Sequence, residues 1–335
     1  MNNKTILITG SSGFIGSYLC KRLLNDYEDI RIVGIDNMND YYDVSLKEER
    51  LSGIQSLHRN FRFVKGDLCD RDLLEKLFEE YHFDLVVNLA AQAGVRYSID
   101  NPDVYVGSNI IGFYNLLEVL RRYPAEHFIY ASSSSVYGGN TKVPFSTDDK
   151  VDHPVSLYAA TKKCNELLAH TYTYLYGMKT TGLRFFTVYG PSGRPDMAYF
   201  SFTKKLLNDE KIRIFNYGKC KRDFTYIDDI VEGIVRIMEQ GPKEDYNLYN
   251  IGNSHPENLM DFVDTLARSL KKYELLPEDF DIEAHMELVE MQPGDVAVTF
   301  ADTSPLEEDY GFRPETPLRD GLDRFAAWYR DHYGK

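Results

Sequence analysis

Two side chains able to take part in proton transfer stand four residues apart in the segment YAATK, at Tyr158 and Lys162. On a helix this spacing places both on one face, about 6 Å apart along the axis. A free phenol has a pKa of about 10, and a neighbouring ammonium group favours its charged form. Such a pair can act as a general base towards a hydroxyl group. The alternative is a purely structural pair, because this spacing is common in helices.

A run of four serines precedes that pair in the segment SSSSVYG, residues 132–138. We expect a strand over 127–135 that carries these serines at its carboxyl end. Doubly wound parallel sheets bind their ligands at that edge. A serine hydroxyl there can share the hydrogen bond of the phenol.

Near the N-terminus, a glycine-rich loop joins a predicted strand, 5–9, to a predicted helix that begins with SYLCKRLL. Gly10 would make the tight turn, Gly13 would let the backbone approach a pyrophosphate, and Gly16 would let helix and strand pack closely. The helix N-terminus supplies amide donors and a positive dipole end. A glycine-rich turn without a ligand is the alternative.

The second predicted strand, 31–37, supports a dinucleotide site because it contains Asp36, twenty residues after Gly16. A carboxylate there can accept from both ribose hydroxyls and would repel a 2′-phosphate, which favours NAD over NADP. Its alternative role is a solvated strand-end cap. Further strands are predicted over 61–68, where Asp67 could meet an adenine, and over 83–94, where Ala90 and Ala91 leave room for a cofactor.

Strands that alternate with helices, such as the one predicted over 71–81, indicate an α/β fold with a doubly wound parallel sheet. Two helices, 108–122 and the one from Tyr158 to the glycine at 177, are apolar on more than one face. The apolar residues that do not pack on the sheet predict a surface that binds another protein. A homodimer in which these two helices and their copies form a four-helix bundle would bury them. A covering loop is the alternative.

Composition limits the remaining classes of function. The chain has 335 residues with a net charge of −14, which disfavours non-specific binding to nucleic acids or anionic membranes. No secretory signal or membrane-spanning segment is apparent. The four isolated cysteines indicate reduced thiols in a cytoplasmic protein. The scattered histidines predict no metal site.

Together, the glycine loop, Asp36, the serine run and the Tyr158/Lys162 pair resemble the extended short-chain dehydrogenases/reductases of the nucleotide-sugar epimerase family. Segments 36–51, 88–103, 183–200 and 221–234 narrow the likeness to its UDP-glucuronate 4-epimerase group. The likeness runs from about residue 4 to 330. It implies a Rossmann-type NAD-binding domain, 1–185 plus about 224–252. It also implies a smaller, discontinuous α+β nucleotide-sugar lobe, about 186–223 and 253–335.

The resemblance implies which residues bind NAD and which bind the UDP-sugar. The implied cofactor residues are Gly10, Gly13, Phe14, Ile15, Gly16, Asp36, Asn37, Asp67, Leu68, Leu89, Ala90, Ala91, Gln92, Asn109, Ser132, Tyr158, Lys162 and Phe185. The implied substrate residues are Ser133, Ser134, Ser135, Thr187, Arg194, Arg222, Arg96, Phe215 and Asp295. Arg222 would bind the diphosphate through its planar fork. An ion pair with Asp223 is the alternative.

The implied reaction converts UDP-glucuronate to UDP-galacturonate, a precursor for polysaccharides. Tyr158 would take the C4 hydroxyl proton, assisted by Ser133 and Lys162, while NAD takes and returns the C4 hydride. The 4-keto intermediate is a β-keto acid, so its carboxylate needs an anchor that prevents loss of carbon dioxide. Ser134, Ser135, Thr187 and Arg194 are the expected anchors, with Arg96 as a weaker candidate.

Three other functions compete with this one. Related dehydratases and decarboxylases carry an acidic residue in the serine segment, and Ser134 and Ser135 stand there instead, which favours epimerisation. A neutral UDP-hexose such as UDP-glucose is an alternative substrate on the same fold. A catalytically idle NAD-binding scaffold protein is the third, although such relatives usually lack the Tyr/Lys pair.

Overall fold

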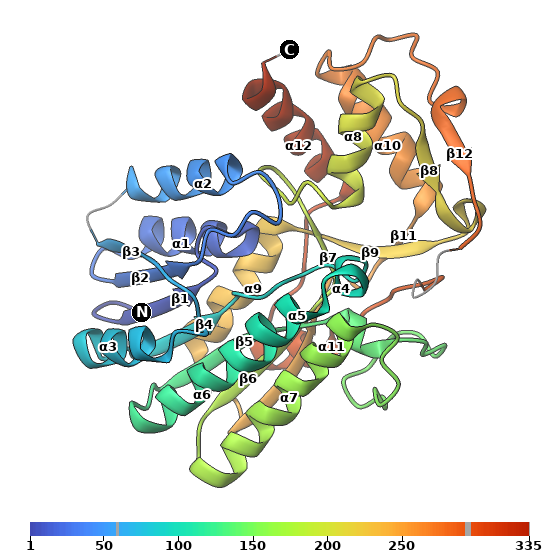
Figure 1. Cartoon of the computed structure of the whole chain (residues 1–335). Coiled ribbons are helices and arrows are strands. Elements are labelled where there is room, and N and C mark those ends of the chain that lie inside the picture. The colour runs from blue at the N-terminus through green and yellow to red at the C-terminus, as the bar shows by residue number, and fades with distance from the viewer. Residues whose placement is uncertain (58–59, 292–295, 335) are drawn as a thin grey trace.

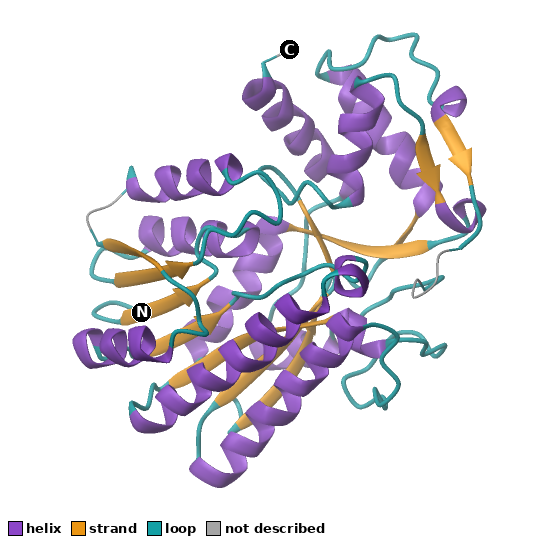
Figure 2. Ribbon diagram, viewed as in Figure 1, coloured by secondary structure: helices purple, strands orange, loops and turns teal. Residues whose placement is uncertain are grey.

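A seven-stranded parallel sheet forms the centre of the computed structural model, which describes residues 1–57, 60–291 and 296–334 (Figures 1 and 2). The strand order is β10-β6-β5-β4-β1-β2-β3. The bounds are β1 Thr5–Thr9, β2 Arg31–Asp36, β3 Phe61–Lys65, β4 Leu85–Asn88, β5 His127–Ser133, β6 Thr180–Phe185 and β10 Tyr246–Ile251. The order reverses beside β1, which creates the crevice where such sheets bind ligands.

Helices cover both faces of this sheet, so its inner strands are buried, whereas the edge strand β3 is partly exposed. On one face lie α3 (Arg71–Tyr81), α6 (Gly112–Arg122) and α7 (Leu157–Tyr176). On the other face lie α1 (Phe14–Asp26) and α9 (Ile227–Gln240), with α2 (Ser45–Gln55) outside α1 and α11 (Ser304–Tyr310) against α9. The predicted doubly wound α/β fold is confirmed.

A smaller lobe lies beside the carboxyl ends of the strands (Figure 1). It contains a three-stranded sheet, β11-β9-β7, and a two-stranded sheet, β12-β8. Their bounds are β7 Thr187–Tyr189, β8 Ile212–Ile214, β9 Lys221–Tyr226, β11 Pro256–Asn258 and β12 Met286–Leu288. The helices are α8 (Ala198–Leu207), α10 (Leu259–Lys272) and α12 (Leu318–Tyr333), with short turns η3 (Phe215–Gly218) and η4 (Glu283–His285).

Several element boundaries differ from the predicted ones. The strands predicted over 61–68 and 83–94 end earlier, at Lys65 and Asn88, because the chain then turns along the edge of the sheet. The predicted strand 127–135 ends at Ser133, and Ser134–Tyr137 form a 3-10 turn, η2. The helix predicted over 108–122 starts with a π-helical turn, η1 (Val106–Ile111), after the short helices α4 (Tyr97–Asp100) and α5 (Pro102–Tyr105).

Local sequence explains where α7 begins and ends. The Ser156 hydroxyl caps its N-terminus by accepting from the Ala159 amide at 3.1 Å, and Gly177 ends it in the left-handed conformation. Because the helix starts at Leu157, Tyr158 and Lys162 lie in its first two turns. The helix therefore delivers both residues to the end of β5.

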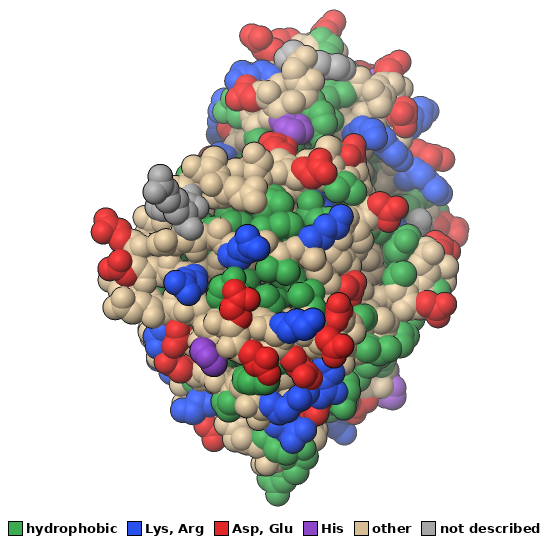
Figure 3. Space-filling view, turned by 60° about the vertical axis from the view of Figure 1, so that its left-hand side comes forward, with side chains coloured by type: hydrophobic (Ala, Val, Ile, Leu, Met, Phe, Trp, Pro, Cys, Tyr) green, Lys and Arg blue, Asp and Glu red, His purple; other side chains and the backbone are tan. Residues whose placement is uncertain are grey.

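The surface carries both signs of charge. On the face in Figure 3, Lys and Arg side chains are interspersed with Asp and Glu instead of gathering in one basic area. Within the described residues, no helix has the length and apolar character needed to span a membrane. The four cysteines are free thiols, two of them buried.

Candidate active site

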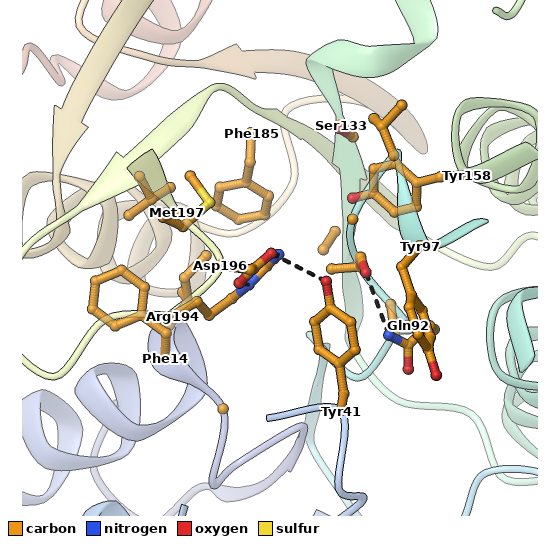
Figure 4. Close-up of a pocket in the computed structure, with 18 of the residues that line it drawn as sticks. Phe14, Tyr41, Gln92, Tyr97, Ser133, Tyr158, Phe185, Arg194, Asp196 and Met197 are labelled. Carbon is orange, nitrogen blue, oxygen red and sulfur yellow. Dashed lines mark hydrogen bonds and ion pairs between the residues drawn. The ribbon is translucent and has the colours of Figure 1, made fainter. Parts of the chain in front are cut away.

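A cavity of about 770 Å³ lies between the carboxyl edge of the main sheet and the smaller lobe (Figure 4). Among the described residues, it is lined by every predicted cofactor and substrate residue except Asn109. Asp295 lies outside the described residues. Residues far apart in the sequence, from the glycine loop to Phe224 and Leu259, thus converge on one space.

The glycine loop is shaped as a cradle for a dinucleotide. Gly10 has a φ of +68°, and a Cβ there would approach the Ala90 amide nitrogen to 2.8 Å. At Gly16 a Cβ would stand 2.2 Å from the Gly10 carbonyl oxygen, so only glycine lets α1 start this close to β1. No side chain caps the N-terminus of α1, whose first residues, Phe14 and Ile15, line the cavity. The amides there fit a pyrophosphate.

Asp36 is buried at the end of β2, which rules out the solvated cap considered above. Its two carboxylate oxygens accept from the amides of Ser12 at 3.1 Å and Met38 at 2.9 Å, and its side chain lines the cavity. Each oxygen keeps a further lone pair, so the carboxylate fits a ribose diol. Nearby, the side-chain amide of Asn37 donates to the Asp67 carboxylate at 2.9 Å. This hydrogen bond connects the loop after β2 with the loop after β3, and both residues line the cavity.

Asn109 is the one predicted cofactor residue that the structure places behind the cavity wall. Its side-chain oxygen accepts from the Gln92 amide at 2.8 Å, and its nitrogen donates to the Gln92 carbonyl at 3.0 Å. The same nitrogen donates to Thr161 on α7. Asn109 therefore holds Gln92 in place from the π-helical turn, and its expected contact with the cofactor stays a prediction.

Ser133, Tyr158 and Lys162 meet at the cavity (Figure 4 labels the first two). Burial raises the pKa of Tyr158, whereas a hydrogen bond from Ser133 and the charge of Arg194 act to lower it. Burial also lowers the pKa of Lys162 to about 8. The Lys162 ammonium donates to the Ala131 carbonyl at 2.9 Å and lies 6.0 Å from the Tyr158 ring centre.

The expected activation of the phenol by the Lys162 ammonium, with a serine hydroxyl sharing its hydrogen bond, stays a prediction for the enzyme with NAD bound. Burial dominates at both groups because it disfavours each charged form. Arg194, 36 residues away in sequence from the phenol, is the cation that lowers the pKa of Tyr158.

Ser132 faces the protein interior, although it also borders the cavity. Its hydroxyl donates to Glu166 at 2.7 Å, and Glu166 forms a two-point ion pair with Arg184 at 2.8 and 2.9 Å. All three side chains are buried. This contact fixes the strand end that presents Ser133.

On the substrate side of the cavity, Arg194 lies across from Tyr158 and forms an ion pair with Asp196 (Figure 4). The Tyr41 hydroxyl donates to the same carboxylate at 3.1 Å. Burial acts to raise the pKa of Asp196, but the Arg194 guanidinium brings it below its usual value. Ser134, Ser135 and Thr187 line the same cavity.

Three further predicted substrate residues, Arg96, Phe215 and Arg222, line the same cavity. The guanidinium groups of Arg96 and Arg213 lie 5.0 and 5.6 Å from the centre of the Phe215 ring. Arg222 also lines the cavity and donates to the Ala297 carbonyl at 3.3 Å. Asp223 is fully buried and accepts from the amides of Asn253, Ser254 and Ala301.

Among the charged or aromatic cavity residues that sequence reasoning missed are Tyr41, Lys47, Asp196 and Arg213. Tyr41, Lys47 and Asp196 belong to segments quoted above for the family resemblance, so the signal was present. Their roles needed distances, because Tyr41 and Asp196 are 155 residues apart.

This site, on a doubly wound sheet, defines an NAD-dependent enzyme of the extended short-chain dehydrogenase/reductase class. The chain belongs to the NAD dependent epimerase/dehydratase family, whose sequence profile matches residues 6–252.

Several relatives carry more specific names. The chain is 50% identical to Protein CapI of Staphylococcus aureus, covering 98% of this chain and 99% of that one. It is 46% identical to UDP-glucuronate 4-epimerase 4 of Arabidopsis thaliana, covering 99% and 76%. A crystal structure of UDP-glucuronic acid 4-epimerase from Bacillus cereus, in complex with UDP-glucuronic acid and NAD, matches with a TM-score of 0.87. That protein is 33% identical, with 98% and 100% of the two chains covered.

Proposed function

We propose that this chain converts UDP-glucuronate to UDP-galacturonate by NAD-dependent epimerisation at C4. The observation that carries the proposal is the placement of a cation, Arg194, across one cavity from Tyr158, with the serine run between β5 and η2 beside them. A phenol base and a cation facing it suit a sugar that bears both a secondary hydroxyl and a carboxylate. The names of the full-length relatives agree with this substrate.

Each residue has a defined task in the proposed reaction. Tyr158 accepts the C4 hydroxyl proton and later returns it, Ser133 shares that hydrogen bond, and Lys162 helps to orient the cofactor beside them. Bound NAD supplies the chemistry of taking the C4 hydride and returning it to the opposite face of the sugar. The glycine loop and Asp36 hold the dinucleotide so that its reactive end reaches the Tyr158 side of the cavity.

The proposed role of Arg194 answers a chemical problem of the intermediate. A β-keto acid loses carbon dioxide when the bond to its carboxylate stands perpendicular to the carbonyl plane. Arg194, with Ser134, Ser135 and Thr187, would hold the carboxylate away from that orientation while the sugar turns over. Asp196 fixes the guanidinium beforehand, so little side-chain entropy is lost on binding.

The purified protein tests the proposal directly. Incubation with UDP-glucuronate should give UDP-galacturonate, resolved by anion-exchange chromatography, with no net change in NADH absorbance. UDP-xylose as the product would instead make the chain a decarboxylase. Arg194→Met should lower kcat/KM for UDP-glucuronate by about 100-fold or more, and for UDP-glucose only by the smaller factor that follows from the altered pKa of Tyr158.

A neutral UDP-hexose is the second candidate, because UDP-glucose 4-epimerase of Thermotoga maritima has the same fold, with a TM-score of 0.82 and 29% identity. Comparing kcat/KM for UDP-glucuronate and UDP-glucose decides between them. Equal values, both changed by the same factor in Arg194→Met, would favour the hexose.

We also propose a homodimer in the cytoplasm. Ile111 and Tyr114 at the start of α6 and Leu167 and Tyr174 on α7 are exposed apolar side chains on neighbouring helices. A second copy of these two helices would cover them in a four-helix bundle. The four free thiols suit a reducing compartment.

The division into an NAD domain and a nucleotide-sugar lobe remains a proposal as well. The position of β10 beside β6 supports the return of the chain to the main sheet after the first part of the lobe. By contrast, α11 packs on α9 and β10, so part of the segment assigned to the lobe lies against the main sheet.

A further inference from the structure

Arg50 on α2 is a buried cation that the proposed mechanism does not use. Its side chain is 1% exposed, and each of its hydrogen bonds ends on a neutral carbonyl or hydroxyl oxygen. A buried charge is costly unless it is fully hydrogen-bonded or compensated by a nearby anion. The hydrogen bonds of Arg50 use all five of its N–H donors, so its role follows from the segments that these bonds hold in place.

The strongest of these contacts hold the loop that leads into Arg194. The Arg50 guanidinium donates to the Ser192 carbonyl at 2.7 and 3.0 Å and to the Gly193 carbonyl at 3.0 Å. Tyr18, on α1, donates to the preceding carbonyl of Pro191 at 3.0 Å. The carbonyls of three successive residues, 191 to 193, therefore accept hydrogen bonds from side chains of α1 and α2. Ser192 has a φ of +53°, an unfavourable conformation that these contacts stabilise.

The other side of the guanidinium reaches the two loops around the dinucleotide cradle. It donates to the Ser12 carbonyl in the glycine loop at 3.3 Å and to the Tyr42 hydroxyl at 2.7 Å. The neighbour of Tyr42 is Tyr41, whose hydroxyl binds the Asp196 carboxylate that pairs with Arg194. One side chain therefore joins the glycine loop, the loop after β2 and the loop that carries Arg194.

We propose that Arg50 is a positioning residue that couples dinucleotide binding to the placement of Arg194. Its planar fork fixes the Arg194 loop relative to the glycine loop, which leads into the N-terminus of α1 where the pyrophosphate would bind. The part concerning Arg194 rests on the proposed function, because it assumes that Arg194 contacts the substrate carboxylate. The part concerning the dinucleotide does not.

Arg50→Lys tests the coupling, since lysine keeps the charge and loses the fork. Two measurements avoid any reliance on activity: the NAD bound per chain after gel filtration, and the calorimetric Kd for UDP-glucuronate and UDP-glucose. The variant should weaken UDP-glucuronate binding roughly tenfold more than UDP-glucose binding, because a displaced Arg194 affects only the carboxylate. It should also lose part of its bound NAD. In an Arg194→Met background, Arg50→Lys should no longer change the ratio of the two Kd values.

Arg22→Lys on α1 is the matched control, because Arg22 pairs with Asp26 and Glu232 outside the cavity. It should leave NAD content and both Kd values unchanged. If Arg50→Lys does not fold, Tyr42→Phe removes one partner of Arg50 and should shift the Kd ratio in the same direction by a smaller factor. Equal weakening of both sugars with full NAD retention overturns the inference.

The outcome separates this inference from the proposed function. A wild-type protein that binds UDP-glucose as tightly as UDP-glucuronate contradicts the proposed function. In that case the NAD bound per chain tests the role of Arg50 without the sugar measurements. An Arg50→Lys variant that retains all of its bound NAD would reject that role.

Discussion

The phenol of Tyr158 is governed by groups from three parts of the chain. Burial raises its pKa, while Ser133 from β5 and Arg194 from the substrate side act to lower it, and Asp196 acts to raise it. The base strength of this one side chain therefore depends on the pair that is proposed to hold the substrate carboxylate. Charge at the binding end and proton transfer at the reacting end are linked through space.

The pH dependence of kcat should report this link. If the phenolate is the active form, kcat rises with pH up to the pKa of Tyr158, measured at saturating UDP-sugar. Arg194→Met removes a group that lowers this pKa, so the rising limb should move to higher pH. Asp196→Asn removes a group that raises it, so the limb should move to lower pH. Shifts in the same direction would refute the electrostatic account.

Lys162 should reduce the stability of the folded chain at neutral pH. Its pKa of about 8 in the folded state lies below the value of 10.5 for a free side chain, so folding disfavours its protonated form. The penalty is complete below pH 8 and disappears as the pH rises to 10.5. Lys162→Met should therefore stabilise the NAD-free protein at pH 7 by roughly 1–3 kcal/mol while abolishing activity. Urea unfolding of both proteins at pH 7 and pH 10 measures this, and an equal difference at both values would contradict it.

At the scale of elements, one face of α7 carries two of the proposed catalytic residues. Tyr158, Lys162 and Glu166 follow at four-residue intervals, so the same face that meets the cavity also binds β6 through Glu166 and Arg184. Burial acts to raise the pKa of Glu166, yet Arg184 and Ser132 bring it below its usual value. This buried contact fixes the helix against the two strands beneath the site.

Breaking that contact should be costly. Glu166→Gln leaves the Arg184 charge buried without its partner, which should destabilise the protein by about 3–5 kcal/mol in urea unfolding at pH 7. Glu232→Gln breaks the exposed pairs with Arg22 and Arg236 and should cost less than about 1 kcal/mol. Comparable losses in the two variants would show that the buried pair has no special role in holding α7.

At the scale of the whole molecule, the described part of the chain exposes apolar side chains on α6 and α7. Leu167 and Tyr174 are 58% and 83% exposed on α7, seven residues apart and on one side of the helix. Large apolar side chains that are exposed and aligned on one side of a helix are typical of a protein–protein interface. The site does not lie on this face, so association and catalysis can be tested separately.

Leu167→Asp should convert the proposed dimer to a monomer of 38.7 kDa, measured by size-exclusion chromatography with light scattering. A charge placed in an apolar interface is strongly unfavourable, so the effect should exceed tenfold in the dissociation constant. Leu288→Asp, on the exposed strand β12, is the control and should leave the mass unchanged. A wild-type protein that is already monomeric would reject the dimer.

Local spacing determined much of the fold and part of the site. The strand–glycine–helix segment, the acidic end of β2 and the four-residue interval in α7 follow from helix and strand periodicity, which is readable within about twenty residues. These features predicted the parallel sheet and the cavity positions of the glycine loop, Asp36, Tyr158 and Lys162. The boundaries were less predictable, as at the π-helical turn before α6, because tertiary contacts of Asn109 decide the backbone there.

Only the tertiary structure decided which charges act on which groups. Nothing in the spacing indicates that Arg194 lies opposite Tyr158, that Tyr41 binds Asp196, or that Arg50 holds the carbonyls of Ser192 and Gly193. These pairs are 36 to 155 residues apart, and they meet because the loop after β7 folds over the loops that follow β1 and β2. Periodicity acts along a helix or strand, whereas the electric field at a site sums over neighbours in space. The sequence by itself therefore determined the reacting groups, and the fold determined their charge environment.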